Sequence, residues 1–211
     1  LQTIVYFRYS LMKGIDFYKY NKIFGIIAGL FAFIVFALTV EPTASYWDCA
    51  EYISTSAKLQ IGHPPGAPLF QMLGAIFSIL AFDVSQIAYA VNMMSVFSSA
   101  MTIMFLFWSI SLIGKQLLKT SEFLNFNDAF KIFGASFLGS ISFTFTDSFW
   151  FNAVEAEVYA MATLILSVLF WLGLKWIEDF EKERSEKWLV LISFVVGLSF
   201  GVHFMGLLAI P

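Results

Sequence analysis

The chain has 211 residues, of which 59% are hydrophobic and only 13% are charged, and its formal net charge at pH 7 is −3. Soluble domains carry about 25% charged residues, so a chain this apolar needs lipid around much of its surface. The acidic balance excludes the basic patch of a nucleic-acid-binding protein. The single cysteine, Cys49, excludes an internal disulfide and a cysteine-based zinc cluster.

Apolar runs long enough to cross a membrane occur five times along the chain. The hydrocarbon core takes about 20 apolar residues in a helix. The runs that qualify are Ile23–Val40, Ile87–Ile113, Ile132–Phe145 continuing toward Trp150, Phe151–Trp176 and Trp188–Ile210. A sixth run, Leu69–Phe82, has only 14 residues, a length typical of an interfacial or re-entrant helix. The sequence therefore predicts an all-α fold, a polytopic transmembrane helical bundle of about five spans plus that extra helix.

The twelve lysines and arginines indicate which way the spans run. If Leu69–Phe82 does not cross the membrane, eleven of them fall on the cytoplasmic side and only Lys58 falls outside. If it does cross, four fall inside and eight outside. Basic residues favour the cytoplasmic side, so we expect a cytoplasmic N-terminus.

Domain organisation follows from these spans. We expect a single transmembrane domain over residues 1–211. In it, residues 1–22 approach the first span from the cytoplasm, residues 41–86 form an outer loop, and residues 87–211 hold four further spans. The chain begins at Leu1 rather than at a methionine and stops at Pro211 directly after an apolar run. We therefore expect it to be the N-terminal part of a longer protein.

The outer loop carries two carboxylates at a spacing that suits catalysis. Asp48 and Glu51 are three residues apart, which puts both on one face of a helix, and Ser45 is placed to cap such a helix. One hypothesis is a general base or a carboxylate that polarises a hydroxyl. The alternative is a solvated interfacial helix with ordinary acidic residues.

Two histidines stand at backbone corners or close to glycines. His63 precedes Pro64-Pro65-Gly66, a sequence that forbids helix and allows a sharp turn. It could bind a phosphate, bind a metal or transfer a proton, or it could simply cap the next helix. His203 is expected in the outer half of the last span among glycines that permit close helix contact, where it is either a packed residue or part of a site.

A second acidic cluster lies where the fourth span is expected to begin. Asn152, Glu155 and Tyr159 follow the i, i+3, i+7 pattern of one helical face, and Glu157 points about 200° away from Glu155. A carboxylate at a membrane span is costly unless it is paired or wet, and therefore indicates function. The alternative is stabilisation by the helix dipole, which explains one acid better than two.

Several of these motifs together resemble a known family. They are Trp47-Asp48-Cys49-Ala50-Glu51-Tyr52, Gly62-His63-Pro64-Pro65-Gly66, Phe149-Trp150-Phe151-Asn152-Ala153-Val154-Glu155-Ala156-Glu157-Val158-Tyr159 and Gly197-Leu198-Ser199-Phe200-Gly201-Val202-His203. The set is similar to the bacterial membrane family called domain of unknown function 2723, which is related to the transmembrane protein 260 type of protein O-mannosyltransferase.

The resemblance implies a glycosyltransferase of the C-type membrane superfamily, in the bacterial inner membrane with its active face toward the periplasm. It implies transfer of mannose or another hexose from a polyprenyl-phosphate carrier to Ser or Thr of exported proteins. Asp48 matches the expected base, with Glu51 second. By position, His63 is expected near the carrier phosphate or the acceptor, and Glu155 and Glu157 near the sugar. The substrate-binding set is completed by Asn152, Tyr159 and His203.

Other functions are consistent with parts of the pattern. A divalent metal held by Asp48 and Glu155 is possible chemistry, although nothing in the sequence requires a cofactor. A non-catalytic scaffold subunit predicts that Asp48 can be replaced without consequence. A transporter predicts polar residues near mid-span and repeated halves, whereas here the acids lie at span ends. The enzyme is therefore the leading hypothesis.

Overall fold

A computed structural model describes residues 14–209 of the chain. Within that range the helices are α2 (Phe17–Thr39), α3 (Cys49–Lys58), α4 (Pro68–Ile79), α5 (Ile87–Leu117), α6 (Phe126–Thr144), α7 (Asp147–Ala153), α8 (Val158–Glu178) and α9 (Glu186–Ser199). Two 3₁₀ segments, η1 (Val84–Gln86) and η2 (Phe204–Ala209), complete the helical structure. The strands β1 (Ile15–Asp16) and β2 (Phe123–Leu124) pair antiparallel, a small exception to the predicted all-α fold.

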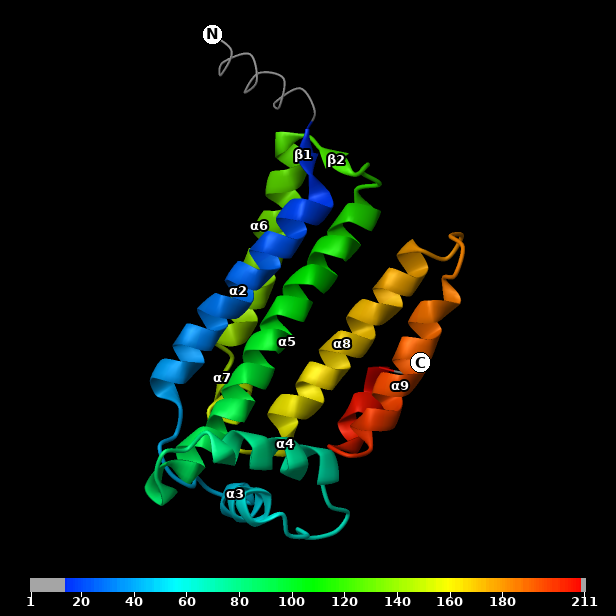
Figure 1. The fold of residues 1–211 in the computed structure, drawn as a ribbon. Coiled ribbons are helices and arrows are strands. Elements are labelled where there is room, and N and C mark those ends of the chain that lie inside the picture. The colour runs from blue at the N-terminus through cyan, green and yellow to red at the C-terminus, as the bar shows by residue number, and fades with distance from the viewer. Residues whose placement is uncertain (1–13, 210–211) are drawn as a thin grey trace.

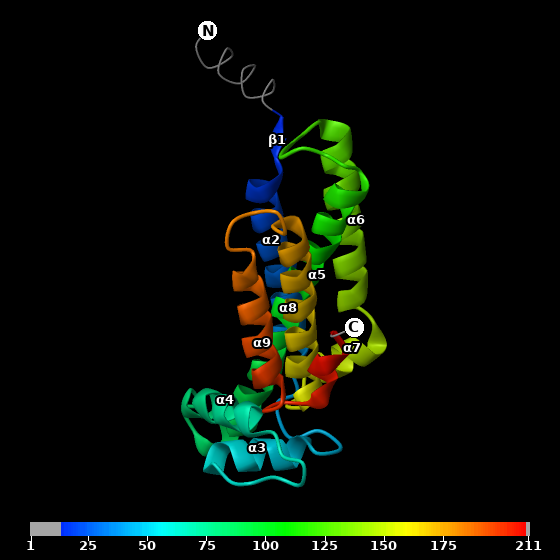
Figure 2. The same ribbon diagram turned by 90° about the vertical axis from the view of Figure 1, so that its right-hand side faces the viewer.

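The long helices form a bundle with one capped end. Helices α2, α5, α6, α8 and α9 run along its length, while α3 and α4 lie across one end (Figures 1 and 2). Helix α5 is central in the bundle. In its most apolar stretch of 18 residues 56% is buried, whereas the corresponding share is 28% in α2 and in α8. Phe36, Phe107 and Phe133 are core residues between α2, α5 and α6.

Fewer helices can cross a membrane than the sequence predicts. Between residues 14 and 209, three helices are long and apolar enough: α2, α5 extended by η1, and α8. A fourth span results if α6 and α7 count as one helix bent by 69°. The first predicted span begins earlier than expected, at Phe17, because the Asp16 side chain accepts the Lys19 N–H over 2.9 Å and caps the helix. Residues 1–13 of the predicted approach segment lie outside the described residues.

The last two predicted spans are wrong in their boundaries. The predicted helix Phe151–Trp176 is interrupted between Ala153 and Val158. The predicted helix Trp188–Ile210 ends at Ser199, because the next turn is held by α4, where the Leu69 N–H donates to the Gly201 carbonyl over 2.7 Å. That contact uses a free N–H of the first turn of α4. Helix α4 has 12 residues, fewer than the roughly 20 that a span takes, and its interfacial or re-entrant role stays a prediction.

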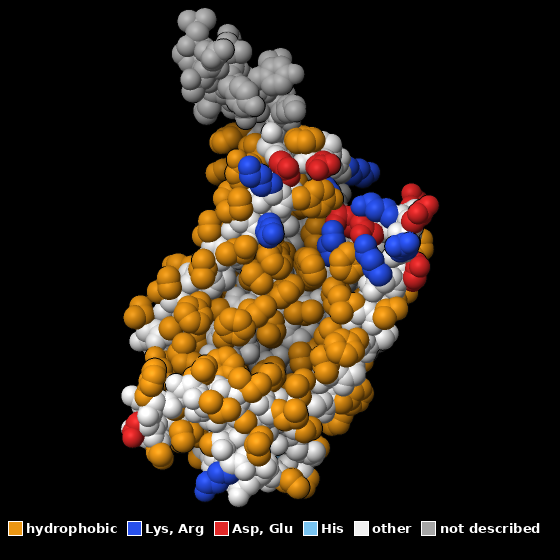
Figure 3. Space-filling model, viewed as in Figure 1, with side chains coloured by type: hydrophobic (Ala, Val, Ile, Leu, Met, Phe, Trp, Pro, Cys, Tyr) orange, Lys and Arg blue, Asp and Glu red, His pale blue; other side chains and the backbone are white. Residues whose placement is uncertain are grey.

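Charge separates the two ends of the bundle. The basic end, as we call it, carries the described Lys and Arg residues other than Lys58, which lies at the end of α3. They are Lys19, Lys22, Lys115, Lys119, Lys131, Lys175, Lys182, Arg184 and Lys187. Figure 3 shows these charges gathered at one end and hydrophobic side chains over the middle. The opposite end, formed by α3, α4 and the α7–α8 break, is the site end.

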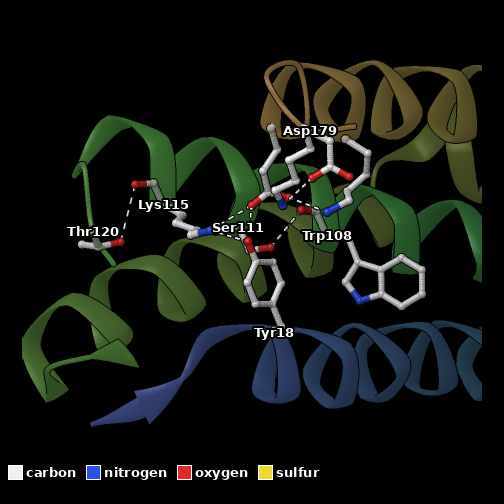
Figure 4. A network of polar contacts seen from close by, with 9 residues as sticks. Tyr18, Trp108, Ser111, Lys115, Thr120 and Asp179 are labelled. Atoms are coloured by element: carbon white, nitrogen blue, oxygen red, sulfur yellow. Dashed lines mark hydrogen bonds and ion pairs between the residues drawn. The ribbon is translucent and has the colours of Figure 1, made fainter. Parts of the chain in front are cut away.

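A polar network closes the basic end (Figure 4). Tyr18 donates its hydroxyl proton to Glu178 over 2.6 Å, and the Lys115 ammonium donates to the same carboxylate oxygen over 2.8 Å. Lys175 forms an ion pair with the second oxygen of Glu178. These four side chains come from α2, α5 and α8, so one carboxylate joins three helices.

The contact between α2 and α5 depends on a residue without a side chain. A Cβ at Gly25 would overlap the indole of Trp108, whose Nε1–H donates to the Asn21 carbonyl over 3.0 Å. We expect Gly25→Ala to lower the free energy of unfolding by about 1–3 kcal/mol. The melting temperature of the full-length protein in detergent should fall by several degrees. Gly134→Ala, on an open face of α6, is the matched control. Equal melting temperatures for the two variants would contradict this account of the packing.

Candidate functional site

The first part of the site is the start of α3. The helix begins at Cys49, with Asp48 as its N-cap residue, so Asp48 precedes the helix instead of lying in it as predicted. Its carboxylate makes no capping hydrogen bond and remains free for other partners. Ser45 does not cap the helix either, because its hydroxyl donates to Glu155 of the α7–α8 break.

His63 joins the two loop carboxylates. Its backbone N–H donates to Glu51 Oε1 over 2.6 Å, and its Nδ1 lies 3.1 Å from Glu51 Oε2. Its Nε2 lies 3.9 Å from Asp48 Oδ2. The hydrogen bond from the His63 backbone lowers the pKa of Glu51 below its ordinary value. His63 follows Glu51 by 12 residues and Asp48 by 15, and the fold brings the three together in a row of carboxylate, imidazole and carboxylate.

The second part of the site is the break between α7 and α8. Glu155 and Glu157 are only 2% and 5% exposed, and neither is helical, so the predicted single helical face of Asn152, Glu155 and Tyr159 is wrong. The break is fixed from outside, because the Glu41 N–H donates to the Val154 carbonyl over 3.0 Å. In each of the two glutamates, Oε1 has no hydrogen-bond partner among the described residues.

Burial dominates the electrostatics of this break. It raises the pKa of Glu155 above its ordinary value, against the opposing hydrogen bond from Ser45. It raises the pKa of Glu157 to about 7, and the negative charges of Asp48 and Glu155 add to the effect. A carboxylic acid that is half protonated near neutral pH can either donate or accept a hydrogen bond.

Two adjoining cavities bring both parts together. One, of about 430 Å³, is lined by Trp47, Asp48, Phe151, Asn152, Glu155, Glu157 and Tyr159. The other, of about 200 Å³, is lined by Asp48, Tyr52, His63, Pro65, Gly66, Glu157, Val158, Tyr159, Phe200, Val202, His203 and Phe204. Asp48, Glu157 and Tyr159 line both. Seven of the eight predicted site residues face these cavities, and the eighth, Glu51, holds His63.

His203 is placed by a turn rather than by a span. It lies between α9 and η2, where its Nδ1 accepts the Met205 N–H over 3.1 Å and its ring lies 5.3 Å from that of Tyr159. The prediction of a helical position is therefore wrong. His203 lines the smaller cavity together with Asp48 and Glu157, and its role in a site stays a prediction. Asn152 lies in α7, and its amide donates to the Ser148 carbonyl over 2.8 Å.

Sequence reasoning missed Asn92 as a residue that shapes the site. It is fully buried in α5, and its amide donates to the Glu41 and Thr43 carbonyls over 2.7 and 2.9 Å. These bonds hold the chain that leads from α2 to Asp48. An amide in the second turn of the predicted span Ile87–Ile113 was the available signal, because a polar group inside a span needs a partner.

Fold and site together define a class: this is an integral membrane protein of helical type with an acidic pocket at one end of its bundle. The family model for the Protein O-mannosyl-transferase TMEM260 N-terminal domain matches residues 48–211. The chain belongs to this family. The predicted relation to that type of protein is confirmed, whereas membership in the bacterial family called domain of unknown function 2723 stays a prediction.

Two curated relatives carry the same name. Protein O-mannosyl-transferase tmem260 of Dictyostelium discoideum is 27% identical over 190 residues, covering 84% of this chain and 21% of the relative. Protein O-mannosyl-transferase TMEM260 of Mus musculus is 26% identical over 168 residues, covering 78% of this chain and 21% of the relative. The chain thus spans about a fifth of the length of these relatives. No solved structure matches it.

Proposed function

We propose that the protein is a membrane glycosyltransferase. It moves mannose or another hexose from a polyprenyl-phosphate carrier to a serine or threonine hydroxyl of an exported protein. The observation that carries the proposal is the convergence of Asp48, Glu157 and Tyr159 on two adjoining cavities at one end of the bundle. The names of the two relatives agree with this reaction class.

Asp48 is the base in the proposed reaction. Its carboxylate is free of a capping bond and faces both cavities. The acceptor hydroxyl oxygen attacks the anomeric carbon while its proton passes to Asp48. The bond between that carbon and the phosphate oxygen breaks, and the lipid phosphate leaves with the electron pair. This reaction needs proton transfer and positioning.

The remaining residues position the substrates. Glu157 offers the sugar hydroxyls either a donor or an acceptor, because its pKa is raised to about 7 by burial. Glu155, fixed by Ser45, lines the larger cavity beside Asn152. His63 lines the smaller cavity, and in the proposed reaction it contacts the carrier phosphate or the acceptor.

An apolar cavity at the same end of the bundle as the site suits the lipid part of the carrier. It has a volume of about 740 Å³ and lies between the end of α4, η1 and the start of α5. Phe77, Leu80, Phe82, Tyr89 and Met93 are among its lining residues. A long isoprenoid tail gains free energy by occupying such a surface, which would leave its phosphate at the site end.

The charge distribution supports an orientation for this reaction. Basic residues collect at the end opposite the site, as they do on the cytoplasmic side of membrane proteins. We place the site end on the outer face, which is the periplasmic face if the membrane is a bacterial inner membrane. An acceptor that is being exported meets the site there.

The scaffold remains the second candidate, and the transporter is third. The exposed Asp48 carboxylate makes no capping hydrogen bond, and Oε1 of Glu155 and of Glu157 has no hydrogen-bond partner among the described residues. These groups favour a site that binds a substrate, because a scaffold gains no stability from them. On the face drawn in Figure 3, acidic side chains lie toward the two ends of the bundle and hydrophobic side chains cover the middle. A transporter needs polar groups near mid-span.

The test uses the full-length protein purified in detergent. It is supplied with polyprenyl-phosphate mannose, or with the corresponding glucose lipid, and with Ser/Thr-containing peptides from exported proteins. We expect mass spectrometry to show the addition of one hexose to a peptide. If no peptide gains a hexose, and exported glycoproteins keep their masses in cells that lack the protein, the transferase is rejected in favour of the scaffold.

A further inference from the structure

Three side chains at the start of α3 form a compact set of metal-ligand groups. A carboxylate oxygen of Asp48, a carboxylate oxygen of Glu51 and a ring nitrogen of His63 all lie within 4.8 Å of one another. Two ligands on one cation at about 2.1 Å each are separated by about 3–4 Å, so small side-chain rotations bring the three into coordination. Glu155, which the sequence suggested as a partner of Asp48, does not belong to this set.

The negative charge here lacks a fixed cationic partner. Among the described residues, the ion pairs at the site end are the two contacts of His63 with Asp48 and Glu51. The pairs that involve lysine all lie at the basic end. A positive ion would therefore balance the negative charge at the site end.

A buried carboxylate independently points to a missing ligand. Glu157 lines the same cavity as Asp48 and His63. It is 5% exposed, and its Oε1 has no hydrogen-bond partner among the described residues. A buried, unpaired carboxylate oxygen is costly, and a cation in this cavity would lower that cost.

We propose that Asp48, Glu51 and His63 bind a divalent cation, with Glu157 supplying further negative charge from the wall of the cavity. The imidazole favours Zn²⁺ over Mg²⁺ or Ca²⁺, which prefer oxygen ligands alone, and the two carboxylates also suit Mn²⁺. Three protein ligands leave open positions toward the cavity. An Asp48 carboxylate that holds the cation through one oxygen keeps its second oxygen for another partner. This inference goes beyond the proposed transfer reaction, because binding can be measured without it.

The experiment is a Mn²⁺ titration of the full-length protein in detergent after removal of metals with a chelator. Electron paramagnetic resonance distinguishes free from bound Mn²⁺. We expect Mn²⁺ to bind at one saturable site. Zn²⁺ should displace the bound Mn²⁺, whereas an equal concentration of Mg²⁺ should not. Since even outer-shell changes at metal sites cost about 10–100-fold in affinity, His63→Ala and Glu51→Gln should each weaken binding at least about tenfold.

Controls separate a lost site from a lost fold. Glu51→Gln keeps an oxygen that can accept the His63 N–H, and its melting temperature without metal should match the wild type. Asp83→Asn, an exposed acid at the turn before α5, should bind Mn²⁺ normally. The site is overturned if the wild type shows no saturable Mn²⁺ binding. It is also overturned if the His63 and Glu51 variants bind Mn²⁺ with the affinity of the wild type. Binding without any sugar transfer would instead reject the proposed function and leave the cation site standing.

Discussion

Replacing Asp48 by Asn in the full-length protein is expected to reduce hexose transfer by at least about 100-fold without changing the amount of protein in the membrane. General-base catalysis contributes about 10²–10⁴ in rate, and an amide cannot take the proton. The fold should tolerate the change, because the Asp48 side chain makes no capping bond and Asn is an equally good N-cap residue. Mass spectrometry of exported glycoproteins, with a membrane immunoblot for protein level, measures both quantities.

Asp83→Asn is the matched control for charge. Asp83 is exposed at the same end of the bundle, and its cap of η1 uses an oxygen that asparagine retains. Exported glycoproteins from cells with the Asp83→Asn protein should carry the same glycans as those from wild-type cells. Unchanged glycans in the Asp48 variant would instead remove this carboxylate as the base and favour the scaffold function.

The gathering of the site segments at one end of the bundle was predictable, because the number of spans between two segments decides whether they reach the same end. Apolar runs and the lysine–arginine asymmetry place the segments around Asp48, Asn152 and His203 at one end, whatever the helices do in detail. The short length of the run after Pro68 was decisive, since a sixth span there would have placed the two acidic segments on opposite sides. The family model that confirms the relation to the transmembrane protein 260 type of protein matches residues 48–211, a range that contains these three segments.

The local geometry was not predictable because contacts distant in sequence create it. Nothing between Phe151 and Trp176 forbids a continuous helix, and alanine, valine and glutamate all tolerate one. The break at Glu155 arises from Ser45, 110 residues earlier, and from the Glu41 contact with Val154. Helical periodicity describes one segment and carries no information about such partners.

The row from Glu51 through His63 to Asp48 shows the same limit at shorter range. The prolines after His63 predict a rigid corner, but they do not say what the imidazole faces. The direction of the imidazole is set by Glu51, which accepts the His63 backbone N–H with one carboxylate oxygen and contacts the ring Nδ1 with the other. A carboxylate that the sequence presents as a second catalytic acid is therefore also the group that orients the histidine.

The largest expected effect on stability lies at the other end of the molecule, at Glu178. Glu178→Ala removes the carboxylate shared by Lys115 and Lys175, whose side chains are only 15% and 17% exposed. Breaking a buried ion pair by removing one partner costs about 3–5 kcal/mol, because the remaining charge is left without compensation. We expect the melting temperature of the full-length protein in detergent to fall markedly. Glu183→Ala, in the exposed turn after α8, should leave it unchanged.

A double variant tests whether the cause is the uncompensated charge. Lys115→Met combined with Glu178→Ala should lose less stability than the sum of the two single changes, because it also removes one of the stranded ammonium groups. Two results would contradict the idea that this network holds α2, α5 and α8 together. One is a loss of stability in the double variant equal to the sum of the two single losses, and the other is equal melting temperatures for the Glu178 and Glu183 variants. Since Glu178 and Asp48 lie at opposite ends of the bundle, a folded Glu178→Gln protein should still transfer hexose. Loss of folding and loss of chemistry then become separable in one chain.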